Sequence, residues 1–336
     1  MVFARHDLRN QVVISLGLIT TFLLERANSV AMAVIETNNL GLSYGTRRGI
    51  TGINLSIEQG QIFGFLGPNG AGKTTTIRIL LGFLAPGQGQ ARILGIDAWK
   101  ESHLVKQDVG YVAGDVRLYP WLTARRAFGI VGKIRQVDLQ SAGLALCERF
   151  RLEPELPVRK MSRGNRQKVA LVLALVHRPK VVILDEPTSG LDPLMQRTLM
   201  DCLRELANDG SAVLFSSHTL SEVEELCDRV AMIRRGRIVV DEALDSLRRR
   251  APRTVSVALP ANVDADMHAL PTGVELLRTT KAGDCQHLEL QLSGTAMPFI
   301  TWAATQGFLD VSIGTPGLDS LFRQYYVNDI IDEGDC

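Results

Sequence analysis

Between residues 34 and 95, short apolar segments alternate with polar turns, which is the pattern of β-strands. Turns such as Glu58-Gln59-Gly60 separate these segments. One helical segment interrupts them, from Gly72 to about Phe83. The predicted strands are Val34–Tyr44, Ile53–Ile57, Gln61–Leu66 and Ala91–Leu94.

The pattern becomes helical from Leu122 to about Phe150 and then returns to alternating strands and helices. Apolar strands separated by helices favour a mainly parallel sheet that is covered on both faces. We therefore predict an α/β fold. The alternating segments are Val181–Leu184, Pro193–Asn208, Ala212–Ser216, Ser221–Leu226 and Val230–Ile233.

Both ends of the chain are expected to lie outside this main domain, which spans residues 32–247. The C-terminal boundary of the main domain is expected near the three arginines that precede Ala251-Pro252. Arginines suit the C-terminus of a helix, so the run is interpreted as the end of the last helix of this domain. Residues 253–336 are expected to form a small α+β accessory domain. Its predicted strands are Thr254–Leu259, Val274–Thr279 and His287–Leu292, and its predicted helices are Met297–Gln306 and Leu318–Tyr326.

Residues 1–31 are open to two interpretations, an extension outside the fold or a signal peptide. Arg5 and Arg9 precede an apolar stretch, but no cleavage site is clear, and Met32 directly precedes the first strand. The stretch from Val12 to Leu24 is shorter than the roughly 20 apolar residues that a membrane-spanning helix needs.

Charge and cysteine usage exclude some classes of function. The chain has 37 Lys and Arg against 36 Asp and Glu, and no basic stripe interleaved with aromatic residues. Nucleic acid is therefore not an expected partner. The five cysteines are scattered without metal-like spacing, which is typical of reduced thiols in a cytosolic protein.

The segment Gly67–Thr74 fits the phosphate-loop pattern G-x-x-x-x-G-K-[ST] at every position, between a predicted strand and a predicted helix. Glycines let backbone N–H groups surround an anion, and the helix N-terminus adds partial positive charge. Lys73 is expected to reach the β- and γ-phosphates, and the Thr74 hydroxyl to bind magnesium. The predicted ATP-binding residues of this segment are Gly67, Asn69, Gly70, Ala71, Gly72, Lys73, Thr74 and Thr75.

A second chemical signal is the apolar run Val181–Leu184, which ends in Asp185 and Glu186. Ligands of open α/β sheets bind beyond the carboxyl ends of the strands. We expect Asp185 to hold magnesium (Mg²⁺), directly or through water, and Glu186 to act as the general base toward the attacking water.

Together with further motifs in the same order, these residues resemble the nucleotide-binding domain of ABC transporters over about residues 33–245. The resemblance implies a P-loop NTPase core that includes an antiparallel β subdomain and a helical subdomain over about residues 115–178. The motifs that carry it are Met161–Lys168, similar to the signature loop and its helix, Ser189–Asp192, similar to the D-loop, and His218, similar to the switch histidine.

The resemblance also implies roles for residues that the first motifs do not include. Ser162 and Gly164 would contact ATP held by a second copy of the chain, and Asp192 of the D-loop is a further candidate ATP-binding residue. His218 would hydrogen-bond the γ-phosphate and help to hold Glu186 and the water. Tyr44 would stack on adenine, with a core residue of an edge strand as the alternative.

The chain departs from the family pattern at two places. In the signature, Met161, Arg163 and Asn165 replace residues of the usual Leu-Ser-Gly-Gly-Gln, and a basic residue at the third position resembles the branch that exports drugs, antibiotics and lipids. Gly114 and Asp115 stand where a magnesium-binding glutamine is usual, so the candidate metal ligands are Thr74, Asp185 and Asp115. Asp115 could serve by a one-residue shift, water could take the place of the glutamine, or Asp115 is only a turn residue.

We therefore expect an ATPase that uses ATP and Mg²⁺, acts as a homodimer and powers a separately encoded permease at the cytoplasmic face of the membrane. The predicted catalytic residues are Lys73, Glu186 and His218. Two alternatives remain at this point. One is a non-transport ATPase of the same family that acts on ribosomes or DNA, and the other is a module that binds ATP without hydrolysing it.

Overall fold

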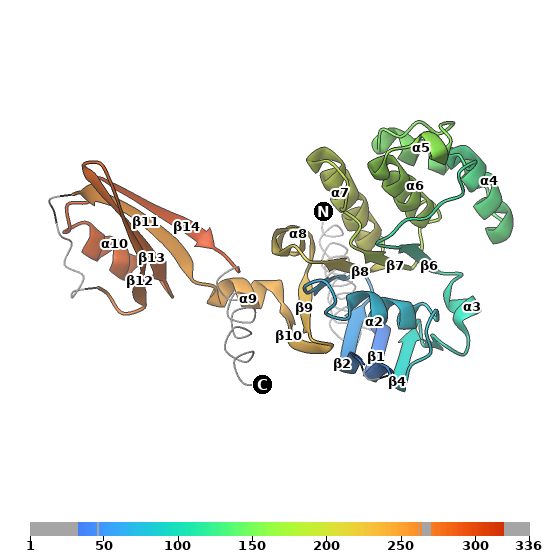
Figure 1. Cartoon of the computed structure of the whole chain (residues 1–336), viewed down its shortest axis with the longest axis horizontal. Helices are drawn as coiled ribbons and strands as arrows, with labels where there is room; N and C mark the ends of the chain where they lie inside the picture. The colour runs from blue at the N-terminus through green and yellow to red at the C-terminus, as the bar shows by residue number, and fades with distance from the viewer. Residues whose placement is uncertain (1–32, 46, 262, 264–269, 319–336) are drawn as a thin grey trace, which may run out of the picture.

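The computed structural model describes residues 33–318, except residues 46, 262 and 264–269. The described residues form a six-stranded sheet, two four-stranded sheets and the helices that cover them. Figure 1 shows the first two sheets and most helices in one body, with the third sheet at the opposite end of the molecule. The predicted helix Leu318–Tyr326 and the N-terminal segment 1–31 lie outside the described residues, apart from Leu318.

The central six-stranded sheet has the strand order β10-β9-β3-β8-β7-β6. All neighbouring strands in it are parallel except β9 and β10. Every residue of β3, β7 and β8 is buried, as expected for strands covered on both faces. The strands are β3 (Ile62–Leu66), β6 (Val109–Val112), β7 (Val181–Asp185), β8 (Ala212–Ser217), β9 (Arg229–Arg234) and β10 (Arg237–Ala243).

An antiparallel sheet with the order β2-β1-β4-β5 packs against one side of the central sheet. Ile35 and Ile53 of this sheet share a core with Phe63 of β3 and with Ile77 of helix α2 (Lys73–Leu80). The helix therefore lies in a fixed position beyond the end of β3. The strands of this sheet are β1 (Ala33–Tyr44), β2 (Arg47–Glu58), β4 (Gln88–Ile93) and β5 (Ile96–Asp97).

The other face of the central sheet is covered by helices that share a second core. The single helical pattern predicted from Leu122 to Phe150 is in fact two helices, because Gln136 adopts a left-handed conformation with φ 57° and ends the first. Asp138 then accepts the N–H of Gln140, where the second begins. The helices of this face are α4 (Ala124–Arg135), α5 (Gln140–Arg149), α6 (Arg163–Leu175), α7 (Pro193–Asn208) and α8 (Leu220–Leu226), with the 3-10 turn η1 (Val158–Lys160). The short helix α3 (Ser102–Val105) instead packs its Val105 into the first core, with the antiparallel sheet.

The third sheet, with the order β12-β13-β11-β14, is antiparallel and has a separate core around Phe299 of helix α10 (Met297–Ala303). Strand β14 was not predicted from the sequence. Helix α9 (Leu244–Arg250) leads to this C-terminal unit, and the Glu224 carboxylate accepts the N–H of Leu318 at 3.1 Å, which ties its end back to α8. The strands are β11 (Arg253–Pro260), β12 (Val274–Ala282), β13 (Cys285–Leu292) and β14 (Asp310–Pro316).

The predicted α/β class, with a mainly parallel sheet, an antiparallel β portion and a helical portion, is confirmed. In the part of the chain that the structure describes, no helix combines the length and the apolar character needed to cross a bilayer.

Candidate active site

The predicted phosphate loop connects β3 to α2, as its sequence context required. Gly70 and Gly72 have φ angles of 80° and 114°, in the region where a side chain is strained. A Cβ atom at Gly72 would also lie 2.6 Å from the Cγ2 atom of Ile50. The glycines are therefore required by backbone conformation and by close packing, and they leave the N-terminus of α2 open to an anion.

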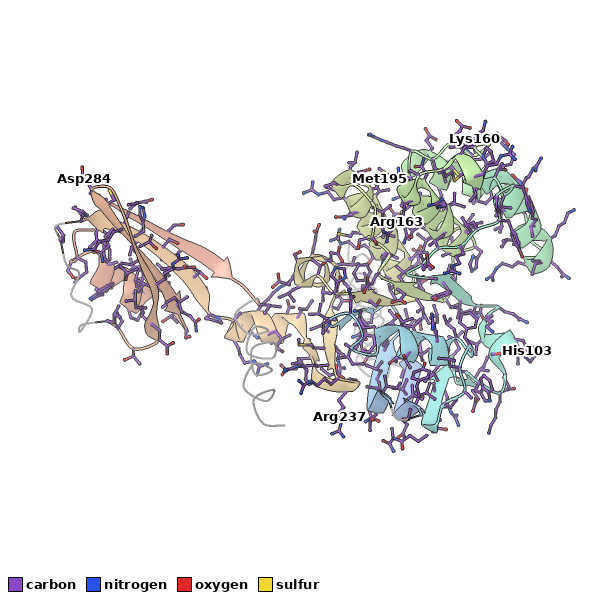
Figure 2. All side chains as sticks on the ribbon, in the orientation of Figure 1. His103, Lys160, Arg163, Met195, Arg237 and Asp284 are labelled. Carbon is purple, nitrogen blue, oxygen red and sulfur yellow. The ribbon has the colours of Figure 1, made fainter. Side chains whose placement is uncertain are left out.

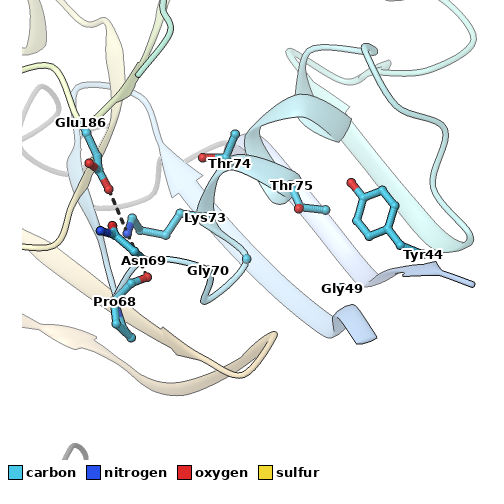
Figure 3. Close-up of a pocket in the computed structure, with 10 residues that line it drawn as sticks. Tyr44, Gly49, Pro68, Asn69, Gly70, Lys73, Thr74, Thr75 and Glu186 are labelled. Atoms are coloured by element: carbon cyan, nitrogen blue, oxygen red, sulfur yellow. Dashed lines mark hydrogen bonds and ion pairs between the residues drawn. The ribbon is translucent and has the colours of Figure 1, made fainter. Parts of the chain in front are cut away.

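The side chain of Lys73 is directed back into this loop. Its ammonium donates hydrogen bonds to the Gly67 carbonyl at 2.6 Å and to the Pro68 carbonyl at 3.2 Å. Lys73 is only 5% exposed, and its Nζ atom lies 3.2 Å from the Glu186 carboxylate, as Figure 3 shows. A buried positive charge is thus held at the point where the phosphate loop faces the end of β7.

A cavity of about 380 Å³ opens beside the loop. Tyr44 lies at one end and is 48% exposed, so its ring is free to stack on a flat ligand (Figure 3). Two predicted loop residues do not line it, since Gly67 uses its carbonyl to hold Lys73 and Ala71 is only 4% exposed. The lining residues are Tyr44, Gly49, Pro68, Asn69, Gly70, Gly72, Lys73, Thr74, Thr75 and Glu186.

Asp185 connects the phosphate loop to the neighbouring strand β8. It is 3% exposed and accepts hydrogen bonds from the Thr74 hydroxyl and from the Ser216 hydroxyl, both at 2.8 Å. A carboxylate beside a threonine hydroxyl is the oxygen-donor set that magnesium prefers. The residues present therefore fit a magnesium ion, which Thr74 and Asp185 would hold.

Glu186 is the residue on which the site converges. Its backbone is left-handed, with φ 48°, which is uncommon for any residue other than glycine and is typical of functional sites. Its N–H donates to the Ser216 carbonyl at 3.2 Å. The carboxylate lies between Lys73 and His218, whose Nδ1 atom is 3.4 Å from it. The structure thus brings the three predicted catalytic residues into one row.

A second cavity, of about 570 Å³, adjoins Thr74, Asp185 and Glu186 and also contains Asp115. The Asp115 side chain is 76% exposed and forms an ion pair with Arg117 at 2.9 Å. A Cβ atom at Gly114 would lie 3.6 Å from Oδ2 of Asp185, so a side chain at Gly114, and not that of Asp115, would start beside the buried carboxylate.

Tyr111 lines the same cavity from the strand β6. Burial raises the pKa of its phenol, and the negative charge of Asp185 raises that pKa further. Tyr111 therefore stays neutral and can only donate or accept a hydrogen bond near the metal-binding carboxylate.

The predicted signature residues lie at the start of α6. The Ser162 hydroxyl accepts the N–H of Asn165 at 3.2 Å and caps the helix, and Asp192 caps α7 in the same way through Met195 at 2.9 Å. Among the described residues that line the two cavities, Ser162, Gly164 and Asp192 are not found. One copy of the chain therefore does not bring its signature loop and its phosphate loop into a single cavity.

Several residues of the site were not predicted, among them Ser216 and Gly49. Ser216 lies opposite Asp185 in the pairing of β8 with β7, so only the register of the two strands reveals its contact. Gly49 lines the first cavity next to Tyr44, and a Cβ atom there would lie 2.5 Å from the Leu42 carbonyl. The only sequence signal for Gly49 is a glycine within a predicted β region, which is too common to identify a site.

A phosphate loop, a buried carboxylate beside its threonine and a second carboxylate facing its lysine define the P-loop class of nucleoside triphosphatases. Comparisons with known proteins agree and are more specific. The profile of the family described as "ABC transporter" matches residues 50–189.

Three similar proteins show how far the likeness extends. The bacitracin transport ATP-binding protein BcrA of Bacillus licheniformis is 37% identical over 220 residues, covering 65% of this chain and 72% of BcrA. A solved ATP-binding subunit of an ABC transporter superposes with a TM-score of 0.61 at 27% identity, over 64% of this chain and 92% of the other. A bacterial ABC transporter cassette solved as a dimer, MJ0796, has the same fold with a TM-score of 0.57 at 23% identity, over 62% of this chain and 98% of the other.

The chain therefore belongs to the family of ABC transporter ATP-binding proteins. It is an ATPase subunit that powers a transporter permease.

Proposed function

We propose that this subunit drives the export of an amphipathic compound, such as a drug, an antibiotic or a lipid, through a permease encoded as a separate polypeptide. The observation that best supports its ATPase activity is that the Glu186 carboxylate lies between Lys73 and His218 beside the phosphate loop. Bacitracin, the compound named for a similar protein, and Arg163 in the signature both support this class of cargo.

The test of the cargo class is a resistance assay. Cells that express the subunit with its permease should tolerate an amphipathic antibiotic better than cells that express the Glu186→Gln subunit with the same permease. Equal sensitivity to a panel of such compounds, with normal ATP turnover, would contradict export of this class.

The working unit in this proposal is a homodimer. The signature residues Ser162 and Gly164 line neither cavity of their own chain, so a second copy is needed to present them to ATP. The open N-terminus of α6 suits a phosphate group. Two copies would therefore close head to tail around two ATP molecules, and hydrolysis would open them again.

Within each site, the triphosphate would lie along the phosphate loop, with adenine on Tyr44. Lys73 would move from the Glu186 carboxylate to the phosphates, because a triphosphate offers more negative charge than one carboxylate. Glu186 would then be free to take a proton from the attacking water, while His218 orients the γ-phosphate.

For magnesium, we propose Thr74 and Asp185 as direct ligands and Asp115 as a residue that acts only through water. Asp185→Asn should raise the Mg²⁺ concentration needed for half-maximal ATPase activity by about tenfold or more. Asp115→Asn should change it at most slightly, because the Asp115 carboxylate is mostly exposed and paired with Arg117. A magnesium titration of both variants checks this, and equal shifts would contradict an indirect role for Asp115.

The permease should bind near the helical part of the chain, at the cytoplasmic face of the membrane. Tyr119 and Trp121 are 69% and 50% exposed, and their rings stack with centroids 5.7 Å apart. Helix α4 adds the exposed Ile130 and Ile134. Large exposed aromatic side chains are the typical anchors of protein interfaces. We propose this region and the loop around Asp115 as the path by which closure of the dimer reaches the permease.

The double variant Tyr119→Ser/Trp121→Ser should weaken binding to the permease by about tenfold or more, because it removes both aromatic anchors. Its ATPase activity without the permease should stay at the wild-type level, since neither ring lines a cavity of the site. Co-purification with the permease measures the first quantity. Leu277→Ser, at a 52% exposed position of β12, is the matched control and should bind normally.

We also propose that residues 32–247 act as the ATPase domain and residues 253–336 as an accessory domain. The separate core of β11 to β14 around Phe299 supports this division. Leu318 packs into the core of the ATPase part, so the two parts would be held together at both ends of the C-terminal unit.

A further inference from the structure

Three contacts attach the start of α6 to the loop that follows Glu186. The Arg163 guanidinium donates to the Ser189 hydroxyl at 2.9 Å. A Cβ atom at Gly164 would lie 2.5 Å from the Gly190 carbonyl oxygen, so the two backbones touch. The Gln167 amide donates to the Pro187 carbonyl at 2.9 Å in a buried position.

The contact of Arg163 differs from the other two because the Arg163 side chain is exposed at the surface. Figure 2 places it where the helical part of the chain meets α7. Its aliphatic stem passes Gly190, with Cγ 3.7 Å from the position of a Cβ atom there. The charged end then reaches Ser189, which gives a charge-assisted hydrogen bond. Deleting this side chain would remove a surface contact and leave the buried packing in place.

The loop at the other end of this contact is short and carries Glu186. The N–H of Ser189 donates back to the Glu186 carbonyl at 3.3 Å, and the N–H of Leu191 donates to the Thr188 carbonyl at 3.0 Å. One turn therefore separates Ser189, the partner of Arg163, from the left-handed residue Glu186, and the turn closed by Leu191 overlaps it on the other side. A displacement of Ser189 would act on the backbone at Glu186, because the hydrogen bond from Ser189 to the Glu186 carbonyl joins the two residues directly.

We infer that Arg163 is a positioning residue that couples the two ATP sites of the dimer, an inference that rests on the head-to-tail dimer proposed above. ATP bound by one copy would draw the signature loop of the other copy toward it. Arg163 and Ser189 belong to the copy whose signature loop moves. Through this pair, the movement would set the position of Glu186 in the site of that same copy. Binding at one site would therefore activate hydrolysis at the other, which is a coupling between sites in the thermodynamic sense.

The test is ATPase kinetics of the full chain with its permease, as a double-mutant cycle. Arg163→Ala and Ser189→Ala should each lower kcat by about threefold to tenfold, the net range of one hydrogen bond at an exposed position, with little change in KM for ATP. The Hill coefficient for ATP should fall toward 1 in both. The double variant should be no worse than either single variant. Arg163→Lys should recover part of the loss, and Arg197→Ala, at an exposed position of α7, should behave as wild type.

Two results would overturn the coupling role. If the losses of Arg163→Ala and Ser189→Ala multiply in the double variant, the two residues act independently, as they would if Arg163 touched the opposite ATP directly. An unchanged Hill coefficient in Arg163→Ala would contradict it as well. Failure of the dimer itself would look different, because wild type would then show a Hill coefficient of 1 and the Glu186→Gln protein would stay monomeric with ATP.

Discussion

Glu186→Gln is expected to lower ATP turnover by about a hundredfold to ten-thousandfold, the contribution of a general base, while ATP stays bound. An amide has nearly the shape of a carboxylate but cannot take a proton from water. The substitution also removes the ion pair of 3.2 Å with Lys73, so the lysine becomes free for the phosphates. Phosphate release measures turnover, and a filter-binding assay measures retained ATP.

The same variant should accumulate as a dimer in the presence of ATP and Mg²⁺, because closed sites that cannot hydrolyse ATP do not reopen. Size-exclusion chromatography detects this change. Glu148→Gln, an exposed carboxylate of α5, is the matched control and should turn over ATP normally. If Glu186→Gln hydrolysed ATP at a rate close to that of wild type, Glu186 would not be the general base.

The position of the phosphate loop, between β3 and α2, could be predicted because its sequence signal lies in one continuous segment. The glycine spacing, the apolar strand before it and the helix after it are all properties of neighbouring residues. The same is true of Asp185 and Glu186, which end a visibly apolar strand. The structure places these two motifs together because β3 and β7 both pair with β8 in parallel.

Contacts between distant segments could not be predicted in this way. Ser216 holds Asp185 only because it is the residue of β8 paired with it, and a shift of one residue would turn its side chain to the other face. The break at Gln136 was missed because a left-handed glutamine leaves no mark in a helical pattern. Strand β14 was missed because it contains Gly314, which is typical of turns and weakens a strand pattern.

Asp115 illustrates the limit of reasoning from a family motif. The sequence offered two neighbouring positions for a missing glutamine, Gly114 and Asp115. The structure shows that the backbone directs position 114 toward Asp185, while the Asp115 carboxylate pairs with Arg117. Whether an acidic residue can substitute by a one-residue shift depends on the local backbone direction, which one-dimensional spacing does not contain.

Lys73→Ala should abolish function in a different way from Glu186→Gln, because it should weaken the binding of ATP as well as its hydrolysis. The Lys73 side chain is 5% exposed, and two carbonyls and a carboxylate already surround its ammonium at the phosphate loop. Loss of a hydrogen bond to a charged group costs about 1.5–3 kcal/mol, so affinity should fall by about tenfold to 150-fold. The rate of hydrolysis of any ATP that still binds should fall by about a hundredfold or more, since Lys73 neutralises charge in the transition state. Isothermal titration with ATP and phosphate release measure the two losses.

The two substitutions together separate charge from structure at this site. In Lys73→Ala, the Glu186 carboxylate faces the incoming phosphates without its cation, so repulsion adds to the lost contact. Lys73→Ala/Glu186→Gln removes that repulsion and should recover part of the ATP affinity but none of the turnover. Lys133→Ala, at an exposed position of α4, should change neither quantity. If the double variant bound ATP no better than Lys73→Ala, the pairing of Lys73 with Glu186 would not govern nucleotide binding, and the lysine would act through the shape of the loop alone.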